Sequence, residues 1–181
     1  MRAGRLLVVS VVAVTAGCST ATPGQPVPQE VGAAPSASGS APVDLADLDP
    51  CGLLTESARA ELDAAPGKRA RDLPSSTGCQ WKVNPGAAIS ESYTVDVAIY
   101  PELGTDRITS TGAKTPMSVN SRPAVRFLGA GGSVCVISLE VSATSRVDVS
   151  ANGAGTNDGA LLCPRAETAA ELIEPELPPA S

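Results

Sequence analysis

Residues 92–100 show the clearest hydrophobic alternation in the chain. Apolar side chains in one phase alternate with Thr94, Asp96 and Ala98, which predicts a strand with one buried face on four residues: Tyr93, Val95, Val97 and Ile99. Other apolar segments bounded by turn residues predict strands at 78–83, 133–141 and 146–153. Residues 117–129 are predicted to form a short hairpin that turns near residues 120–123, and residues 68–77 and 101–115 are predicted loops.

The start of this region has the spacing of a helix. Leu54, Ala58 and Leu62 recur every four positions, which places them on one face. Asp49 is expected to cap this helix and Pro50 to begin it, because these residue types are favoured at those positions.

A second helix is predicted at residues 163–178. Pro164 suits its start and Pro175 its end, and its apolar positions follow helical spacing: Ala166, Ala169, Ala170 and Ile173. The chain therefore reads as one helix, five or six mostly antiparallel strands and one helix. This order predicts an α+β fold in which both helices pack on the sheet.

The first 17 residues have the three parts of a secretory signal. Arg2 and Arg5 precede an apolar run over residues 6–16, and the small residues Ala16 and Gly17 close it. A membrane-spanning helix needs about 20 apolar residues, so this run is too short to be one. We expect residues 1–17 to be a signal peptide that is removed from an exported protein.

The segment from Thr15 to Cys18, TAGC, resembles the lipobox of bacterial lipoproteins, in which the cysteine becomes the acylated amino terminus. The resemblance implies that acyl chains on Cys18 anchor the protein at the extracytoplasmic face of the cell membrane, since two chains hold firmly. It also accounts for one of the five cysteines. The alternative is an ordinary signal peptide with Cys18 as an unpaired thiol, because Thr15 stands where lipoboxes usually carry leucine.

Composition divides the mature chain at residue 44. Residues 18–43 are rich in Pro, Ala, Ser and Gly with Glu30 as their one charge, so we expect a disordered tether. Residues 44–181 are long enough for a single domain with a modest aliphatic core. The chain has 19 acidic and 13 basic residues, two of the basic ones in the signal. This acidic balance argues against nucleic acid and anionic lipid headgroups as partners.

Five short stretches carry a further resemblance: DPCGLLT at 49–55, GCQW at 78–81, SRPAV at 121–125, CVISLEV at 135–141 and CPRAETAAELIEPELP at 163–178. Together with the lipobox and tether they resemble an actinobacterial lipoprotein family known as domain of unknown function 3558. Ser121 departs from that family's usual Gly-Arg-Pro-Ala turn. The resemblance implies an envelope location and a helix–sheet fold, and it implies no activity.

Four cysteines remain for the exported domain: Cys51, Cys79, Cys135 and Cys163. Small exported domains gain stability from disulfides, so two are expected. Cys135 opens a predicted strand whose neighbour ends shortly before Cys163. This favours Cys135–Cys163 together with Cys51–Cys79, and the rival pairing is Cys79–Cys135 with Cys51–Cys163.

The chain contains no histidine, which excludes Ser-His-Asp and Cys-His catalysis and the usual zinc sites. A pair of carboxylates could still act, as in glycoside hydrolysis. The candidates are Asp96, Glu140 and Asp148. Each occupies the polar phase of an alternating strand, so we interpret them as a solvated sheet face and expect no catalytic residue.

The remaining polar features are interpreted as structural. Residues 155–159 are predicted to be a turn, and Trp81 is expected to pack against a disulfide. Arg122 and Arg126 are interpreted as surface charge and not as an anion site. Three acidic residues suggest calcium by composition but lack the glycine and distal glutamate of a calcium loop, so no metal site is expected: Asp44, Asp47 and Asp49.

These observations favour a non-enzymatic binding or interaction module of the cell envelope, without a cofactor and with an envelope protein as partner. The second hypothesis is a carrier of an apolar small molecule such as an envelope lipid. An enclosed apolar pocket of at least ~300 Å³ would favour this carrier over a protein-binding module, which a filled core with a flat exposed apolar patch would favour. A carboxylate-based hydrolase is the third.

Overall fold

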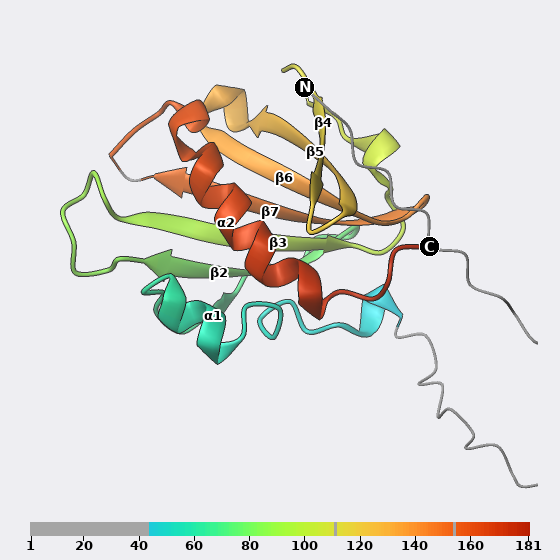
Figure 1. The fold of residues 1–181 in the computed structure, drawn as a ribbon, viewed down its shortest axis with the longest axis horizontal. Coiled ribbons are helices and arrows are strands. Elements are labelled where there is room, and N and C mark those ends of the chain that lie inside the picture. Colours follow the sequence, from blue (N-terminus) through green and yellow to red (C-terminus); the bar gives the residue numbers. More distant parts are fainter. Residues whose placement is uncertain (1–43, 111, 154) are drawn as a thin grey trace, which may run out of the picture. The chain divides into compact units, whose positions relative to one another are not determined.

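The computed structural model describes residues 44–181 apart from residues 111 and 154, and its strands form one antiparallel sheet (Figure 1). The predicted signal peptide, Cys18 and the predicted tether lie outside the described residues. In spatial order the strands are β1 (Lys68–Arg69), β2 (Thr77–Val83), β3 (Tyr93–Tyr100), β7 (Ser145–Gly153), β6 (Val134–Ser142), β5 (Arg122–Gly129) and β4 (Thr115–Val119). No helix of the described residues is long and apolar enough to span a membrane.

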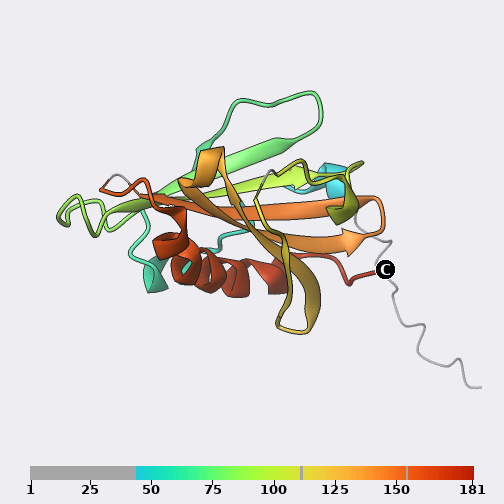
Figure 2. The same ribbon diagram turned by 90° about the horizontal axis from the view of Figure 1, so that it is seen from above.

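The central strands give the sheet two different faces, because successive side chains point to opposite sides. Helix α2 (Cys163–Ile173) contacts β6 and β7, and Figure 2 shows it along one side of the sheet. On this helix face, Val97 of β3 and Val149 of β7 are almost fully buried. Four side chains of α2 complete the core with no exposed surface: Ala166, Ala169, Ala170 and Ile173. The second face is the opposite side of the same strands.

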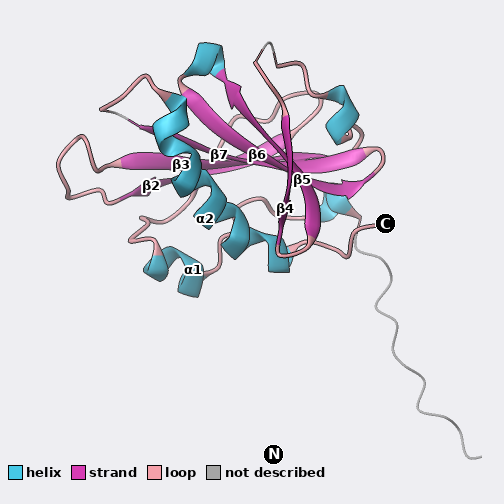
Figure 3. Cartoon of the chain, turned by 45° about the horizontal axis from the view of Figure 1, so that its top comes forward, coloured by secondary structure: helices cyan, strands magenta, loops and turns pink. Residues whose placement is uncertain are grey.

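The carboxyl-terminal helix follows the predicted pattern. Pro164 lies in the first turn of α2, where its missing N–H breaks no helical hydrogen bond. The α-helix ends at Ile173 and continues as a 3-10 turn over Glu174–Glu176 that contains Pro175. Figure 3 shows α2 crossing the central strands. Its small buried side chains let it approach the sheet closely.

The sheet has seven strands, where the sequence predicted five or six. The strand that the prediction missed is β1, which falls in the segment taken as the loop 68–77. Lys68 pairs with Gln80 and Arg69 pairs with Cys79. Both β1 residues are exposed, so the sequence shows no alternation of apolar and polar residues at this strand. Only its backbone pairing with β2 defines it.

The helix expected to begin at Pro50 is instead preceded by a turn. The Asp49 carboxylate accepts the Cys51 backbone N–H at 3.2 Å, and the Gly52 N–H donates to the Asp49 carbonyl. Such a local bond competes with helix formation. The helical turns of α1 run over Glu56–Glu61, and Thr55 is the cap, accepting the Ala58 N–H at 3.3 Å.

Two disulfides cross-link the fold. The structure joins Cys51 to Cys79 and Cys135 to Cys163, the pairing that the sequence favoured. The first links the turn before α1 to β2, and the second links β6 to the first residue of α2. Each closes a separation of 28 residues. One therefore fixes the turn before α1 to the sheet, and the other fixes the start of α2.

Candidate functional site

The second face carries a row of polar side chains brought together by strand pairing. Asp96 of β3 lies opposite Ser150 of β7, and Ala98 lies opposite Asp148. One step further, Tyr100 lies opposite Arg146. Asp96 and Asp148 are thus diagonal neighbours on adjacent strands, on the same face. On the far side of β7, Asp148 pairs with Ser138 and Ser150 with Val136 of β6.

Asp148 is held in a buried network. Ser138 Oγ donates to its Oδ1 at 2.6 Å, and Arg146 Nε donates to the same oxygen at 3.0 Å. The Asp148 and Arg146 side chains are only 13% and 7% exposed. Burial raises the pKa of Asp148, while the Arg146 charge and the hydrogen bonds from Ser138 and Arg146 oppose the rise. The carboxylate is neutralised within the fold and is fixed in position.

Arg146 joins this network to the loop that follows β3. Its Nη1 donates to the Leu103 and Gly104 carbonyls at 2.9 and 3.0 Å. Its guanidinium stacks over the Tyr100 ring, 4.0 Å from the ring centroid. These bonds satisfy most of what a buried guanidinium requires. Arg146 is therefore a structural cation whose charge serves Asp148.

Asp96 has no such counter-charge. It is partly buried and accepts one bond, from Asn152 Nδ2 at 2.8 Å. Burial raises its pKa to about 6, and the Asn152 bond only partly opposes that rise. Among the ion pairs of the described residues, none includes Asp96. A neutral amide is thus the partner of a carboxyl group that ionises close to neutral pH.

An open groove runs over these residues. One lobe, of about 260 Å³, is lined by Asp96, Ala98, Tyr100, Phe127, Val136, Asp148 and Ser150. The other, of about 320 Å³, lies toward the loop at 108–110 and toward residues 127–131, which are the end of β5 and the turn that follows it. Tyr100, Phe127 and Asp148 line both lobes, so we treat them as one second-face groove.

The walls of the second-face groove are held by specific contacts. Thr105 Oγ1 donates to Glu140 at 3.2 Å, and Ser110 Oγ donates to the Leu128 carbonyl at 3.1 Å. Ile108 is 5% exposed, although it lies outside the main core cluster. The loop 101–110 is therefore packed onto the second face and forms a fixed rim.

The three acidic candidates are not a solvated surface, which corrects the sequence interpretation. All three are partly buried, the Asp148 side chain being 13% exposed, and each accepts a hydrogen bond. Alternation correctly assigned them to one face. It did not reveal that the loop and the end of β5 border that face, because those contacts are long-range.

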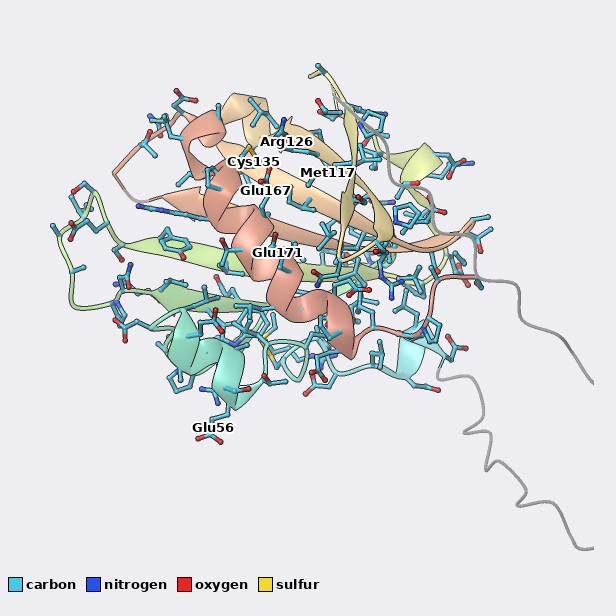
Figure 4. All side chains as sticks on the ribbon, in the orientation of Figure 1. Glu56, Met117, Arg126, Cys135, Glu167 and Glu171 are labelled. Atoms are coloured by element: carbon cyan, nitrogen blue, oxygen red, sulfur yellow. A yellow bond between two sulfur atoms is a disulfide. The ribbon has the colours of Figure 1, made fainter. Side chains whose placement is uncertain are left out.

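Arg122 is also not surface charge. Its side chain is 5% exposed, and its Nε donates to Glu174 at 2.9 Å. It also donates to the Glu140 and Pro178 carbonyls, which ties the chain end to the sheet. Arg126 is half-exposed and pairs with Glu167 of α2 at 2.8 Å (Figure 4). The Arg122 guanidinium is thus fully engaged within the fold, and that of Arg126 has a carboxylate partner on α2.

The other sequence candidates have structural contacts. Trp81 is 1% exposed. Its indole nitrogen and the Cys79 sulfur both lie close to Gly67, where a side chain would collide with them. Asp44 and Asp158 cap 3-10 turns, and Asp49 pairs with Arg69. Within residues 44–110, 112–153 and 155–181, no group of three or more His, Cys, Asp or Glu side chains is arranged to hold a metal ion.

Sequence reasoning missed several groove residues. Tyr100 ended one predicted strand and Phe127 lay within the predicted hairpin, and the pairing of the strand that holds Arg146 and Asn152 with the strand at 92–100 was not predicted. The strand order β3-β7-β6-β5 is what gathers them. A correct register for β3 against β7 would have placed Asn152 and Ser150 beside Asp96.

Comparison with protein families gives one match. A family model described as "Protein of unknown function (DUF3558)" matches residues 13–176, which is most of the chain. No curated protein and no solved structure matches.

Proposed function

The chain belongs to the DUF3558 family, and we propose that its domain is a non-enzymatic binding module of the cell envelope. The observation that carries the proposal is the second-face groove, where Asp96 and two aromatic rings line an open cavity on paired strands. Side chains on strands are held more precisely than those on free loops. The groove therefore suits recognition of a partner group.

We propose further that the domain is lipid-anchored at the extracytoplasmic face of the membrane. The support is the signal-like start of the chain with Cys18 at its end. A tether over residues 18–43 would let the groove reach partners beyond the membrane surface. Mass spectrometry of the membrane-extracted protein should show acylated Cys18, and Cys18→Ser protein should leave the detergent phase. A mature terminus at another residue would contradict the anchor.

The groove proposal is tested by crosslinking in the native envelope. A benzoylphenylalanine in place of Tyr100 keeps an aromatic ring in the groove and adds a photoreactive group. The same replacement at Ile89, which is 68% exposed in the β2–β3 connection, is the matched control. We expect a discrete adduct with a protein partner from position 100 and none from position 89. Equal labelling at both positions would refute the groove as the binding surface.

A carrier of an apolar molecule is the second proposal, favoured by a different cavity. An open pocket of about 370 Å³ lies between β5 and the start of α2, and Phe127, Leu128 and Ala160 are among the residues that line it. The space between α2 and the sheet is filled by Ile173 and its neighbours, so an acyl chain would have to use this open pocket. Native mass spectrometry of the mildly extracted protein would show a bound lipid if the carrier proposal holds.

A carboxylate-based hydrolase is the third proposal. The pKa of Asp96, about 6, suits proton transfer near neutral pH. Its diagonal neighbour Asp148, however, is already bonded through Oδ1 to Ser138 and Arg146. A second carboxylate with that oxygen engaged is poorly placed to activate water, so we rank hydrolysis below binding.

A further inference from the structure

We propose that the second-face groove binds an alkylammonium group, with Asp96 as its counter-charge and the rings of Tyr100 and Phe127 as its walls. The inference rests on the proposed binding function and names the chemistry that it recognises. An alkylammonium can come from a lysine side chain of a partner protein or from a small free amine. Both sources present the same group to the site.

The charge balance of the groove favours a cation. Its lining contains two carboxylates, Asp96 and Asp148, and one guanidinium, that of Arg146. Arg146 and Asp148 neutralise each other at 3.0 Å. When Asp96 ionises, no cation of the lining balances its negative charge. Keeping a carboxylate partly buried without a cation beside it costs free energy. An incoming ammonium would supply that missing charge.

The residues around Asp96 do not supply a positive charge to balance its carboxylate. On β2 its direct neighbour is Gln80 and its diagonal neighbour is Lys82, and on β7 its neighbours are Ser150 and Asn152. Lys82 is the nearest cation by strand register, yet its side chain is exposed and makes no ion pair with Asp96 within 4.0 Å. The groove side of Asp96 therefore faces uncharged groups and the Asp148 carboxylate.

The aromatic lining favours a cation over a neutral ligand. Tyr100 and Phe127 line the same lobe as Asp96, and aromatic faces attract cations through the ring quadrupole. The chain already uses this interaction in the groove, because the Arg146 guanidinium stacks on Tyr100. An alkylammonium also has a methylene stem, which would contact Phe127 and Val136 while its charged end faces Asp96.

An anionic ligand fits this lining poorly. It would lie in the same lobe as the Asp96 carboxylate, and like charges at close range repel. The single cation of the lining, Arg146, is engaged by Asp148 and by two backbone carbonyls. The cation preference thus follows from the bonds that are already made.

The test is an NMR titration of the exported domain within the full mature chain, at about 0.15 M salt. The probes are n-butylammonium chloride and n-butanol, which share a stem and differ in charge. We expect butylammonium to shift the backbone amide signals of Asp96, Tyr100 and Ser150 at pH 7.5, and butanol to leave them unchanged. Equal shifts with the two probes would overturn the proposal.

Two variants locate the charge. Asp96→Asn keeps the shape of the side chain and its bond with Asn152, and it should weaken butylammonium binding at least about tenfold, or about 1.4 kcal/mol. Asp63→Asn is the matched control, because Asp63 is exposed and its positive φ of 49° also suits asparagine. Unchanged binding in Asp96→Asn protein would overturn the proposal, whatever its stability.

The pH dependence and the source of the amine complete the design. Butylammonium affinity should rise as pH rises through about 6, because Asp96 ionises there. Nα-acetyl-lysine methylamide, used as a third probe, distinguishes a protein source from a free amine if one binds more tightly. An adduct crosslinked at position 100 without any ammonium preference would defeat this inference and leave the binding function standing. An adduct that maps outside the groove would defeat the binding function itself.

Discussion

The two faces of the sheet use the same strands in different ways. On the helix face, β-branched and small side chains exclude water, and the buried ion pair Arg122–Glu174 ties the chain end to the sheet. On the second face, the same strands carry hydroxyls, carboxylates and an arginine in a network that stays open to solvent at one side. The comparison teaches that the packed core and the open groove are built from alternate residues of the same strands.

The largest expected effect tests the helix face. Ile137 and Val136 are adjacent on β6 and point to opposite faces, with 0% and 8% exposure. Ile137→Ala should destabilise the domain by about 2–5 kcal/mol, because it leaves a cavity in a filled core. Val136→Ala should cost about 1–2 kcal/mol at ~0.8 kcal/mol per methylene, since the groove beside it is open. Urea unfolding measures both, and similar losses would show that the two faces are equally packed.

The second prediction concerns the cross-link that fastens α2 to the helix face. The double variant Cys135→Ala/Cys163→Ala should lose about 3 kcal/mol, because a closed loop of this length limits the unfolded chain. Thermal unfolding gives the loss, and peptide mapping without reductant verifies that Cys51–Cys79 persists. Butylammonium binding, measured well below the transition, should be unchanged. A variant that binds amine as weakly as Asp96→Asn would show that the groove depends on this cross-link.

The difference between the faces also explains what the sequence could predict. The helix face was largely predictable, since alternation in residues 92–100 and helical spacing in α2 are local patterns that burial enforces. The disulfide pairing followed from where two predicted elements begin and end. The two-residue strand β1 and the late start of α1 were not predictable, because pairing and a single Asp49 bond decide them.

Only some features of the second-face groove could be predicted from the sequence. Asp96 and Asp148 were singled out as strand acids, and their shared phase was correct. Their burial was not foreseen, because Phe127 lies far from both acids in the chain, as does the loop 101–110 from Asp148. The same holds for Arg122, whose partner Glu174 is 52 residues away. Long-range contacts turned predicted surface charges into buried ones.

The third prediction uses pH to sharpen the contrast at Asp96. Its pKa of about 6 in the folded state exceeds the unfolded value of about 3.9, so the folded state binds the proton more tightly. The resulting stability is fully present below pH ~4 and is lost as pH rises through about 6. Asp96→Asn mimics the neutral acid, so it should stabilise the domain at pH 7.5 by on the order of 1–3 kcal/mol and have little effect at pH 4.

Urea unfolding at the two pH values measures the Asp96 effect. The exposed control Asp63→Asn should show no such crossover, because water solvates its carboxylate in both states. A destabilised Asp96→Asn domain at pH 7.5 would mean that Asp96 is compensated in solution, for example by Lys82. Lys82→Gln then distinguishes the cases, since loss of a real partner would raise the pKa of Asp96 further. If Asp96→Asn protein is more stable at pH 7.5 and no longer binds the amine, the ionised Asp96 lowers the stability of the domain and is needed for amine binding.

The smallest effect is expected in a turn that belongs to neither face. Asn120 and Ser121 join β4 to β5 with φ values of 47° and 80°, as a two-residue hairpin of type I′ requires. A side chain at Ser121 is strained in that region, whereas glycine adopts it freely. Ser121→Gly should therefore stabilise the domain by about 0.5–1 kcal/mol, after the larger unfolded-state entropy of glycine is subtracted. Thermal unfolding measures the gain, and Ser118→Gly, within β4, should instead lower stability because its backbone is extended. Unchanged butylammonium binding in Ser121→Gly protein would show that the hairpin can be tightened without altering the groove, and a loss of stability would contradict the left-handed geometry at position 121.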